Sequence, residues 1–520
     1  MTDIRSPNLS RGLRLTKPAV RGPGGIVTAH NRHAAHIGAE VLRAGGTAVD
    51  AAIAASFAIG VLEPWMSGVG GVGAMLVRPA GGPVTAIDAG ARSPAGLNPA
   101  DFPLVGGKDG DLFGWPNVLE DRNVIGARSV CIPGLLRGLE AAHARFGRMP
   151  WADLVTPAVR LAAEGPVVDA VTTLWIAQDM GRIRRNPACA AWFLPGGLPP
   201  VAPAAVSGQV ARLPNPALSQ TLARIAAEGP AALYTGDIAR ALAEDVQALD
   251  GWLSVDDLAG FAAVTVEAAQ QPFRDRTVHF VPRLNGGPTV AMALRLLQGD
   301  DIVASAEAMA RAWDHRFTEM GDGAQPSCTT HLSVVDREGM TVTLTQTLLS
   351  LFGSGVVSPQ TGILLNNGVN WFDPRPGRVN ALGPAKKALA NYAPMMMTGP
   401  GEDVTALGGS GGRKILPAVY QALIHLTQGM DLEQAIAAPR YDLSAPPTMV
   451  VDARLGRDAI DRLGAKFPIV ISERMEHPNN FTTLGAVRRR AGINEGMAEP
   501  WHPWSDAVQE GDALFPGEEG

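Results

Sequence analysis

The sequence predicts a mixed α/β protein in which helices pack outside stacked sheets. Helical and strand-like segments alternate along most of the 520 residues. Hydrophobic residues make up 46% of the chain, which is enough for a large core. A tight hairpin between residues 327 and 347 has one polar and one apolar face, and the candidate chemistry lies on it. The alternation alone does not fix the order of the layers.

The first elements follow clear local rules. Residues 25–29 read as a strand, and residues 33–44 as a helix that ends at Gly45. Thr47 can cap a second helix that runs to Leu62. This second helix is almost entirely small and apolar, so we expect it to be buried.

The rest of the chain alternates in the same manner. We expect paired helices over 133–164 and 214–250, a helical connector at 256–261, strands at 264–266 and 277–281, a helix over 286–297, strands at 362–365 and 404–407, and helices at 415–427 and 431–438. Residues 301–328 are polar and contain glycine, so we expect an exposed linker there.

A glycine-rich stretch raises one alternative function. Gly68-Val-Gly-Gly-Val-Gly73 matches the dinucleotide-binding string. It follows a helix and precedes the strand at 74–78, which is the reverse of the order that a pyrophosphate site needs. We therefore interpret it as a tight loop in which backbone passes close to other backbone.

Composition and charge narrow the function classes. A net charge of −6 gives no attraction for nucleic acid or for an anionic membrane. Three cysteines without a CxxC pair argue against a disulfide framework or a structural zinc site. His30, His33 and His36 have no following carboxylate at ligand spacing, which argues against a metal site formed by these histidines. Residues 1–20 contain charges and no apolar signal-type segment, and the longest apolar run, 51–62, is too short to span a bilayer. We expect a soluble cytoplasmic protein without metal or cofactor, and homo-oligomerisation stays open.

The hairpin has a register that its turn sets. Residues 337–339 form a three-residue loop ending in glycine, which places Asp336 opposite Met340. The polar face then consists of the pairs Thr329–Thr347, His331–Thr345 and Ser333–Thr343. The other face carries Leu332, Val334, Val342 and Leu344. The polar face of a half-buried hairpin normally turns to water, and opposed threonines also stabilise sheets, so the register alone leaves a structural role open beside a catalytic one.

Several motifs resemble the γ-glutamyltransferase family of N-terminal-nucleophile hydrolases. They are Cys328-Thr-Thr-His-Leu-Ser-Val-Val-Asp, Leu344-Thr-Gln-Thr, Phe352-Gly-Ser-Gly and Gly362-Ile-Leu-Leu-Asn-Asn367. Residues 24–77, 128–167 and 408–415 also resemble the family, so the likeness spans most of the chain. It implies a four-layer αββα sandwich.

The resemblance further implies that the chain cuts itself between Cys328 and Thr329. The products would be a large subunit, residues 1–328, and a small catalytic subunit, residues 329–520, held together by a shared core. An exposed, strained linker before the cut would suit this reaction.

The chemistry that follows centres on a threonine. A Thr hydroxyl is a weak nucleophile and needs a base. Freed by cleavage, the α-amino group of Thr329 has a reference pKa of about 7.7–8 and can take the hydroxyl proton through water. By resemblance, Thr347 hydrogen-bonds to Thr329, and the amides of Gly411 and Gly412 bind the tetrahedral oxyanion. The substrate is then a small-molecule amide, and the reaction passes through a Thr ester.

The predicted donor pocket departs from the family pattern. Gly90 stands where the γ-glutamyl enzymes have an Arg for the substrate α-carboxylate, with Arg92 two residues on. The family's Asn, Gln, Asp and Ser-Ser are replaced in this chain by Leu349, Gly368, Trp371, Met395 and Met396. Apolar replacements would leave a zwitterionic glutamyl head unpaired. We expect an altered acyl pocket, with Arg92 or Lys414 available for one carboxylate.

Three functions stay open at this point. The first is a self-processing amide hydrolase or acyltransferase with an altered donor pocket. The second is a true γ-glutamyltranspeptidase or glutathione hydrolase that binds the head group differently, through Arg92, Arg413 or Lys414. The third is a non-catalytic homologue that only binds a ligand or partner.

A rival chemistry uses the glycine turn itself. Gly408-Gly-Ser-Gly-Gly412 satisfies the nucleophile-elbow pattern between a strand and a helix. Asp431 or Asp442, followed by His477 or His502, could complete a triad in the right order.

Overall fold

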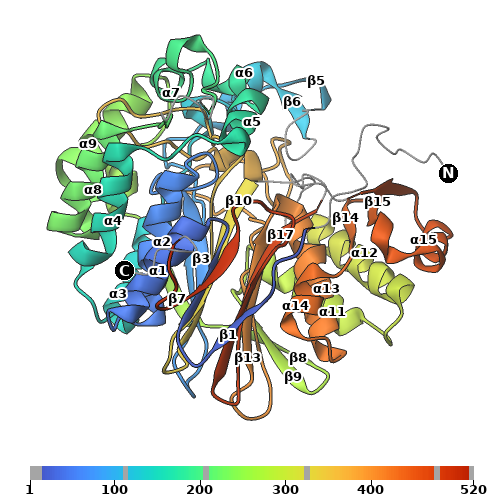
Figure 1. The fold of residues 1–520 in the computed structure, drawn as a ribbon. Helices are drawn as coiled ribbons and strands as arrows, with labels where there is room; N and C mark the ends of the chain where they lie inside the picture. The colour runs from blue at the N-terminus through green and yellow to red at the C-terminus, as the bar shows by residue number, and fades with distance from the viewer. Residues whose placement is uncertain (1–14, 109–114, 203–209, 321–327, 474–480, 515–520) are drawn as a thin grey trace.

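Two seven-stranded sheets lie face to face at the centre of the protein, and helices cover the outer face of each (Figure 1). This computed structural model describes residues 15–108, 115–202, 210–320, 328–473 and 481–514. The order helix, sheet, sheet, helix confirms the four-layer αββα sandwich that the resemblance implied.

We call the first sheet the hairpin sheet. In spatial order its strands are β19 (Asp506–Gln509), β2 (Ile26–Ala29), β10 (Cys328–Val335), β11 (Thr341–Leu349), β3 (Val72–Arg78), β4 (Thr85–Ala89) and β7 (Val264–Glu267). The helices on its outer side are α1 (Arg32–Arg43), α2 (Ala48–Leu62) and α3 (Leu135–Phe146), and beyond them α4 (Trp151–Glu164), α8 (Pro216–Glu228) and α9 (Gly236–Gln247).

We call the second sheet the glycine-turn sheet. In spatial order its strands are β1 (Val20–Gly22), β18 (Ile493–Ala498), β17 (Thr483–Arg490), β13 (Val404–Ser410), β12 (Met395–Thr398), β9 (Arg276–Phe280) and β8 (Ala269–Phe273). The helices on its outer side are α11 (Gly287–Leu296), α13 (Ile415–Thr427) and α14 (Leu432–Ala437), with α12 (Ile302–Thr318) beside α11.

Smaller elements lie at the margins of the sandwich. They are α5 (Ala170–Gln178), α6 (Met180–Ile183), α7 (Pro187–Phe193), α10 (Val255–Ala259), α15 (Arg457–Gly464), the strand pair β5 (Leu104–Lys108) and β6 (Pro116–Val118), and a sheet of β14 (Tyr441–Ala445), β15 (Thr448–Asp452) and β16 (Ile469–Ser472). Among the described helices, none is long and apolar enough to cross a membrane.

Strand alternation divides the core into three interfaces. On β10, Leu332 packs with the helices outside the hairpin sheet. On the glycine-turn sheet, Met396 and Ala406 belong to the cluster between the two sheets. Their strand neighbours Met395 and Leu407 belong to the cluster under the outer helices. Apart from edge strands such as β7, each sheet is therefore buried on both faces.

Helix α2 forms as its sequence predicts. Thr47 accepts a hydrogen bond from the backbone of Asp50, and the Asp50 side chain accepts one back from Thr47, which is a capping box. Asp50 also accepts from the backbone N–H groups of Arg148 and Met149, at 3.0 and 3.2 Å. The small residues of α2 are buried along nearly its whole length, where they lie against the hairpin sheet, α1 and α4.

Strands from both sides of the expected cut alternate within each sheet. In the hairpin sheet, β10 lies between β2 and β11, so a strand that follows residue 328 pairs with one that precedes it. In the glycine-turn sheet, β12 pairs with β9 in the same way. Fragments made by a cut before residue 329 would share hydrogen-bond ladders and all three core interfaces, and so would stay associated.

The glycine stretch after α2 is a close backbone crossing, as predicted. A Cβ on Gly70 would overlap the carbonyl oxygen of Leu364, and one on Gly71 would overlap that of Thr347. The Gly71 carbonyl in turn accepts hydrogen bonds from the backbone of Gly134 and Leu135, at 2.9 and 3.0 Å. The loop therefore sets the position of β11 rather than binding a nucleotide.

We expect Gly71→Ala to lower the free energy of unfolding by about 1–3 kcal/mol, because the added methyl group must displace the β11 backbone. Urea unfolding followed by tryptophan fluorescence measures this change. Gly106→Ala is the matched control, since nothing lies within 4 Å of a Cβ there. Equal stability of the two variants would contradict the close crossing.

Two expectations about elements are wrong. Residues 302–318 of the expected linker form α12, which Asp301 caps and which buries Met309 and Trp313 on one side. The helical spacing of the apolar residues outweighed the polar composition of this segment. The rest of the expected linker, residues 321–327, lies outside the described part of the chain. The strand expected at 362–365 is reduced to one bridge between Val357 and Leu364.

Candidate active site

The hairpin forms with the predicted register over most of its length. His331 pairs with Thr345 and Ser333 with Thr343. The ladder then shifts, because Thr330 faces Gln346 while Cys328 faces Leu349. One residue of β10 thus opposes two of β11, which is a β-bulge.

The bulge corrects the expected pairing of Thr329 with Thr347. Thr329 stands opposite the two residues Thr347 and Leu348, not opposite a single partner. The Thr347 hydroxyl accepts a hydrogen bond from the Leu349 N–H at 2.8 Å, and Leu349 has a left-handed φ of 85°. The turn that these residues make inserts the extra position, and a period-two count could not detect it.

The polar face of the hairpin lies between the two sheets and is closed off from water. Thr329 is 1% exposed, and Thr347 and Thr345 are fully buried. The apolar face packs with the outer helices. The interpretation that the polar face turns to bulk water is therefore wrong for this hairpin.

His331 organises that polar layer. Its Nδ1 is 3.0 Å from the Thr345 hydroxyl and its Nε2 is 3.0 Å from the Ser333 hydroxyl, which in turn donates to Thr343 at 3.2 Å. A Cβ on Gly408 of the opposite sheet would lie 2.5 Å from the imidazole ring. Burial, helped by the nearby His30, holds the pKa of His331 well below its ordinary value of 6.5. An imidazole with both ring nitrogens in hydrogen bonds thus packs directly against the opposite sheet.

The glycine turn lies at the same end of the sandwich as Thr329. Thr343 contacts the Leu407 carbonyl at 3.4 Å, and His331 contacts Gly408, so β13 runs past β10 in the direction of Thr329. After Ser410 the chain turns at Gly411, with φ of 140°, and at Gly412, with φ of 65°, before α13 begins. These angles are open to glycine and strained for other residues.

The turn offers two unused donors. Neither the Gly411 nor the Gly412 amide N–H has a hydrogen-bond partner among the described residues. Paired backbone N–H groups that lack partners are suited to bind an oxyanion. The structure therefore leaves these amides available for the role that the resemblance implied.

The nucleophile-elbow alternative loses its context. The strand before the elbow serine, β13, pairs antiparallel with both neighbours. A nucleophile elbow instead follows a strand of the mostly parallel sheet of an α/β-hydrolase. Asp431 caps α14, Asp442 binds the backbone and hydroxyl of Ser444, and His502 stacks near His30. His477 lies outside the described residues. No triad forms around the turn from the residues that the structure describes.

Three of the predicted donor-pocket residues come together. Leu349, Trp371 and Met396 are fully buried in the large apolar core between the two sheets, and Tyr392 lies in the same core. The Trp371 and Tyr392 rings meet edge to face, with centroids 6.2 Å apart. Leu349 pairs directly with Cys328, so it lies next to the expected nucleophile. Met395 is not part of this core and faces α11 and α13 on the other side of β12.

Tyr392 occupies the place that an Arg side chain would need at position 90. A Cβ on Gly90 would overlap the Tyr392 hydroxyl and would lie 2.9 Å from Oδ1 of Asp88. Asp88 also forms an ion pair with Lys387. Burial raises the pKa of Tyr392 well above its ordinary value of 10, so its hydroxyl stays protonated. Sequence reasoning missed Tyr392 and Lys387, since only the fold brings them to Gly90 and Asp88.

The two predicted carboxylate partners are in different surroundings. Arg92 has an exposed side chain, and its backbone forms a bridge with Lys387. Lys414 is half-buried directly after the glycine turn, where its charge opposes the burial that raises the pKa of Asp442 to about 6. The neighbouring Arg413 is buried, donates to the Ser444 carbonyl at 3.0 Å and lies over the Phe317 ring. Lys414 is therefore the better placed of the two beside the glycine turn.

Comparison with known proteins identifies the family to which this site and fold belong. The family model described as gamma-glutamyltranspeptidase matches residues 34–325 and 304–513. The chain belongs to the gamma-glutamyltranspeptidase family. Membership makes it a self-processing amide hydrolase or acyltransferase of the N-terminal-nucleophile type.

Relatives in this gamma-glutamyltranspeptidase family carry two kinds of name. The Acylase ACY 1 proenzyme of Pseudomonas sp. (strain V22) is 33% identical over 475 residues, covering 82% of this chain and 83% of that protein. Glutathione hydrolase 3 of Arabidopsis thaliana is 29% identical, covering 85% and 76%. The crystal structure of cephalosporin acylase from Bacillus halodurans matches with a TM-score of 0.80 at 23% identity, covering 97% and 98%, and shows the shared fold.

Proposed function

We propose that this enzyme cleaves a small amide whose acyl group is apolar or singly charged and lacks an amino-acid head. Leu349, which pairs with Cys328 directly before the expected nucleophile, carries this proposal together with the burial of Trp371 and Met396 in the same core. Apart from the indole N–H of Trp371, these side chains offer neither a charge nor a hydrogen bond to a zwitterionic group, and burying an unpaired charge among them would be costly. The acylase relative at 33% identity supports the same direction.

Strain at Leu349 strengthens the proposal. Its φ of 85° is energetically unfavourable for leucine, whereas the Asn that the γ-glutamyl enzymes carry at this position tolerates a left-handed backbone. A leucine kept in that conformation costs about 1–3 kcal/mol and persists where its side chain is needed. Its full burial in the donor cluster supplies that need.

Self-cleavage before Thr329 would make the residue competent. Cutting the Cys328–Thr329 bond converts an amide nitrogen, which cannot accept a proton, into an α-amino group with a pKa near working pH. The Thr329 hydroxyl oxygen then attacks the substrate carbonyl while its proton passes through water to that amine. The Gly411 and Gly412 amides stabilise the negative tetrahedral oxygen.

Collapse of that intermediate completes the transfer. The C–N bond of the substrate breaks, and the leaving amine takes the proton that the α-amino group holds. The acyl group remains as an ester on Thr329. Water, activated by the same amine, hydrolyses the ester to the acid, or an acceptor amine takes the acyl group.

A true γ-glutamyl enzyme is the second candidate. The glutathione hydrolase relative at 29% identity favours it, and Lys414 after the glycine turn could bind a substrate carboxylate. A non-catalytic homologue would not need unpaired amides at the glycine turn.

We expect catalytic efficiency on a neutral acyl p-nitroanilide to exceed that on γ-glutamyl-p-nitroanilide by at least about tenfold, since each tenfold step corresponds to about 1.4 kcal/mol of unpaired-charge penalty. Initial rates of nitroaniline release measure both. Rapid γ-glutamyl turnover with competition by glutathione would instead establish the second candidate.

We expect Leu349→Asn to shift that preference toward the γ-glutamyl donor by about tenfold, because it adds a hydrogen-bonding group and suits the left-handed backbone. The ratio of kcat/KM for the two anilides measures the shift. Ala491→Asn is the matched control, since Ala491 is also left-handed, with φ of 49°, but lies in an exposed turn. An equal ratio in both variants would remove Leu349 from the donor pocket.

A further inference from the structure

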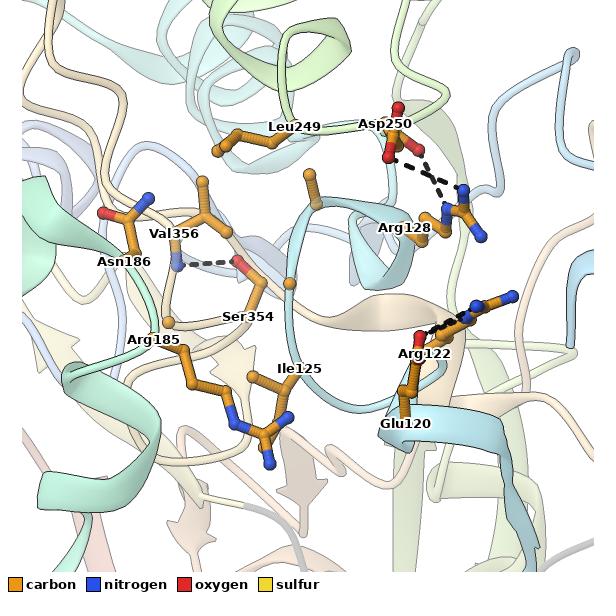
Figure 2. Close-up of a pocket in the computed structure, with 13 residues that line it drawn as sticks. Glu120, Arg122, Ile125, Arg128, Arg185, Asn186, Leu249, Asp250, Ser354 and Val356 are labelled. Carbon is orange, nitrogen blue, oxygen red and sulfur yellow. Dashed lines mark hydrogen bonds and ion pairs between the residues drawn. The ribbon is translucent and has the colours of Figure 1, made fainter. Parts of the chain in front are cut away.

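A cavity of about 320 Å³ is lined by residues outside the candidate active site (Figure 2). Its walls come from segment 120–128, from Arg185 and Asn186 before α7, from Leu249 and Asp250 after α9, and from segment 354–356. None of Thr329, Thr347, the oxyanion glycines or the donor cluster lines it. Its volume suits a small organic molecule.

One part of the lining is cationic. Arg122, Arg128 and Arg185 line the cavity together with two carboxylates, Glu120 and Asp250. The carboxylates face solvent more than their partners do: the Asp250 side chain is 83% exposed and that of Arg128 is 25% exposed. The lining therefore keeps one net positive charge, with the negative groups at its outer edge.

Two of the three ion pairs at this cavity are loose, whereas Arg122 is held by Glu120 at 2.7 Å. Arg128 lies 3.8 Å from the Asp250 carboxylate, and Arg185 lies 3.5 Å from Asp121, which does not line the cavity. Exposed pairs of this kind contribute little to stability, so an arriving anion can replace the carboxylate. The guanidinium of Arg185 is the easiest of these for an anion to bind, because its ion pair with Asp121 is long and both side chains are about half exposed.

Apolar side chains form another part of the lining. Ile125, Leu249 and Val356 line the cavity beside the charged residues (Figure 2). Leu249 is 44% exposed in the protein, so a ligand body packed on it would remove apolar surface from water.

Backbone strain gathers at the same place. Glu120, Asp121 and Asp250 have φ values of 58°, 56° and 59°, in the left-handed region that non-glycine residues seldom adopt. These are the three acids that pair with the cavity's arginines. Strained backbone that positions charged groups around a cavity is a feature of ligand sites.

We propose that this cavity binds a small organic monocarboxylate with an apolar body. The carboxylate pairs with the Arg185 guanidinium, whose planar fork matches two carboxylate oxygens. The body packs on Ile125, Leu249 and Val356, and Arg128 adds positive charge from another wall. A single negative charge fits the one net positive charge of the lining, whereas phosphate would bring more charge and no apolar surface.

The test is isothermal titration calorimetry of the wild-type protein with hexanoate, hexanamide and inorganic phosphate. We expect hexanoate to bind, hexanamide to bind at least about tenfold more weakly because it lacks the charge, and phosphate to bind more weakly than hexanoate. Arg185→Gln should weaken hexanoate by about tenfold. Arg295→Gln is the matched control, since Arg295 is exposed on α11 and distant from the cavity lining.

A second variant keeps the test independent of the arginine. Leu249→Glu places a negative charge on the apolar wall and should weaken hexanoate by a similar factor while leaving the thermal midpoint unchanged. Hexanoate binding that is equal in Arg185→Gln, Leu249→Glu and Arg295→Gln would overturn the site. Phosphate that binds more tightly than hexanoate, with the same dependence on Arg185, would overturn the monocarboxylate assignment.

Discussion

Thr329→Ala is expected to leave one uncut chain and no measurable amide turnover. The variant lacks the hydroxyl that attacks both the Cys328–Thr329 bond and the substrate, so both reactions lose their nucleophile. Loss of a covalent nucleophile removes several orders of magnitude in rate, on the order of 10³ or more. A denaturing gel and an anilide assay on the same preparation measure the two effects.

Thr330→Val is the matched control for that experiment. Thr330 is adjacent and fully buried, and its hydroxyl has no hydrogen-bond partner among the described residues. Valine keeps its shape, so we expect normal cutting and turnover. Loss of cutting in Thr330→Val, with Thr329→Ala still cut, would move the nucleophile by one residue and contradict our assignment.

Thr347→Val is expected to lower kcat by about 10–100-fold while the fold persists. Thr347 holds the bulge through the Leu349 N–H and lies opposite Thr329. Without this hydroxyl, the turn at Leu349 loses a hydrogen bond. That turn positions both the strand residues opposite Thr329 and the Leu349 side chain in the donor pocket. Kinetics on the preferred anilide, together with a thermal unfolding scan, separate turnover from stability.

Thr341→Val controls for the loss of a buried threonine hydroxyl on the same strand. Its hydroxyl donates to the Gly339 carbonyl at 3.3 Å, at the far end of β11. We expect its kcat to match wild type. A similar fall in both variants would mean that Thr347 acts only through the stability of the strand.

Local signals in the sequence predicted much of the fold. The cap and composition of α2, the span of α13 and the hairpin turn each follow from neighbouring residues, and each formed as expected. The strand β19 did not follow, because it pairs with β2 from the other end of the chain. The local sequence of β19 is too weak a strand pattern to predict its pairing with β2. Such long-range pairing needs the fold itself.

The site divides in the same way. The family motif located Thr329, Thr347 and the glycine turn, and the structure brings them to one end of the sandwich. The motif could not reveal the bulge, since one inserted residue leaves the composition unchanged. Nor could it reveal Tyr392, which fills the space at Gly90 from a loop about 300 residues further along.

Intact mass spectrometry of the purified protein, mixed briefly with a neutral acyl anilide, tests whether the chain cuts itself before Thr329 and uses that residue as its nucleophile. We predict two chains, with the smaller one beginning at Thr329 and carrying one acyl group as an ester on that residue. A fully active chain that remains uncut, or an acyl group found on another residue such as Ser410, would contradict the account.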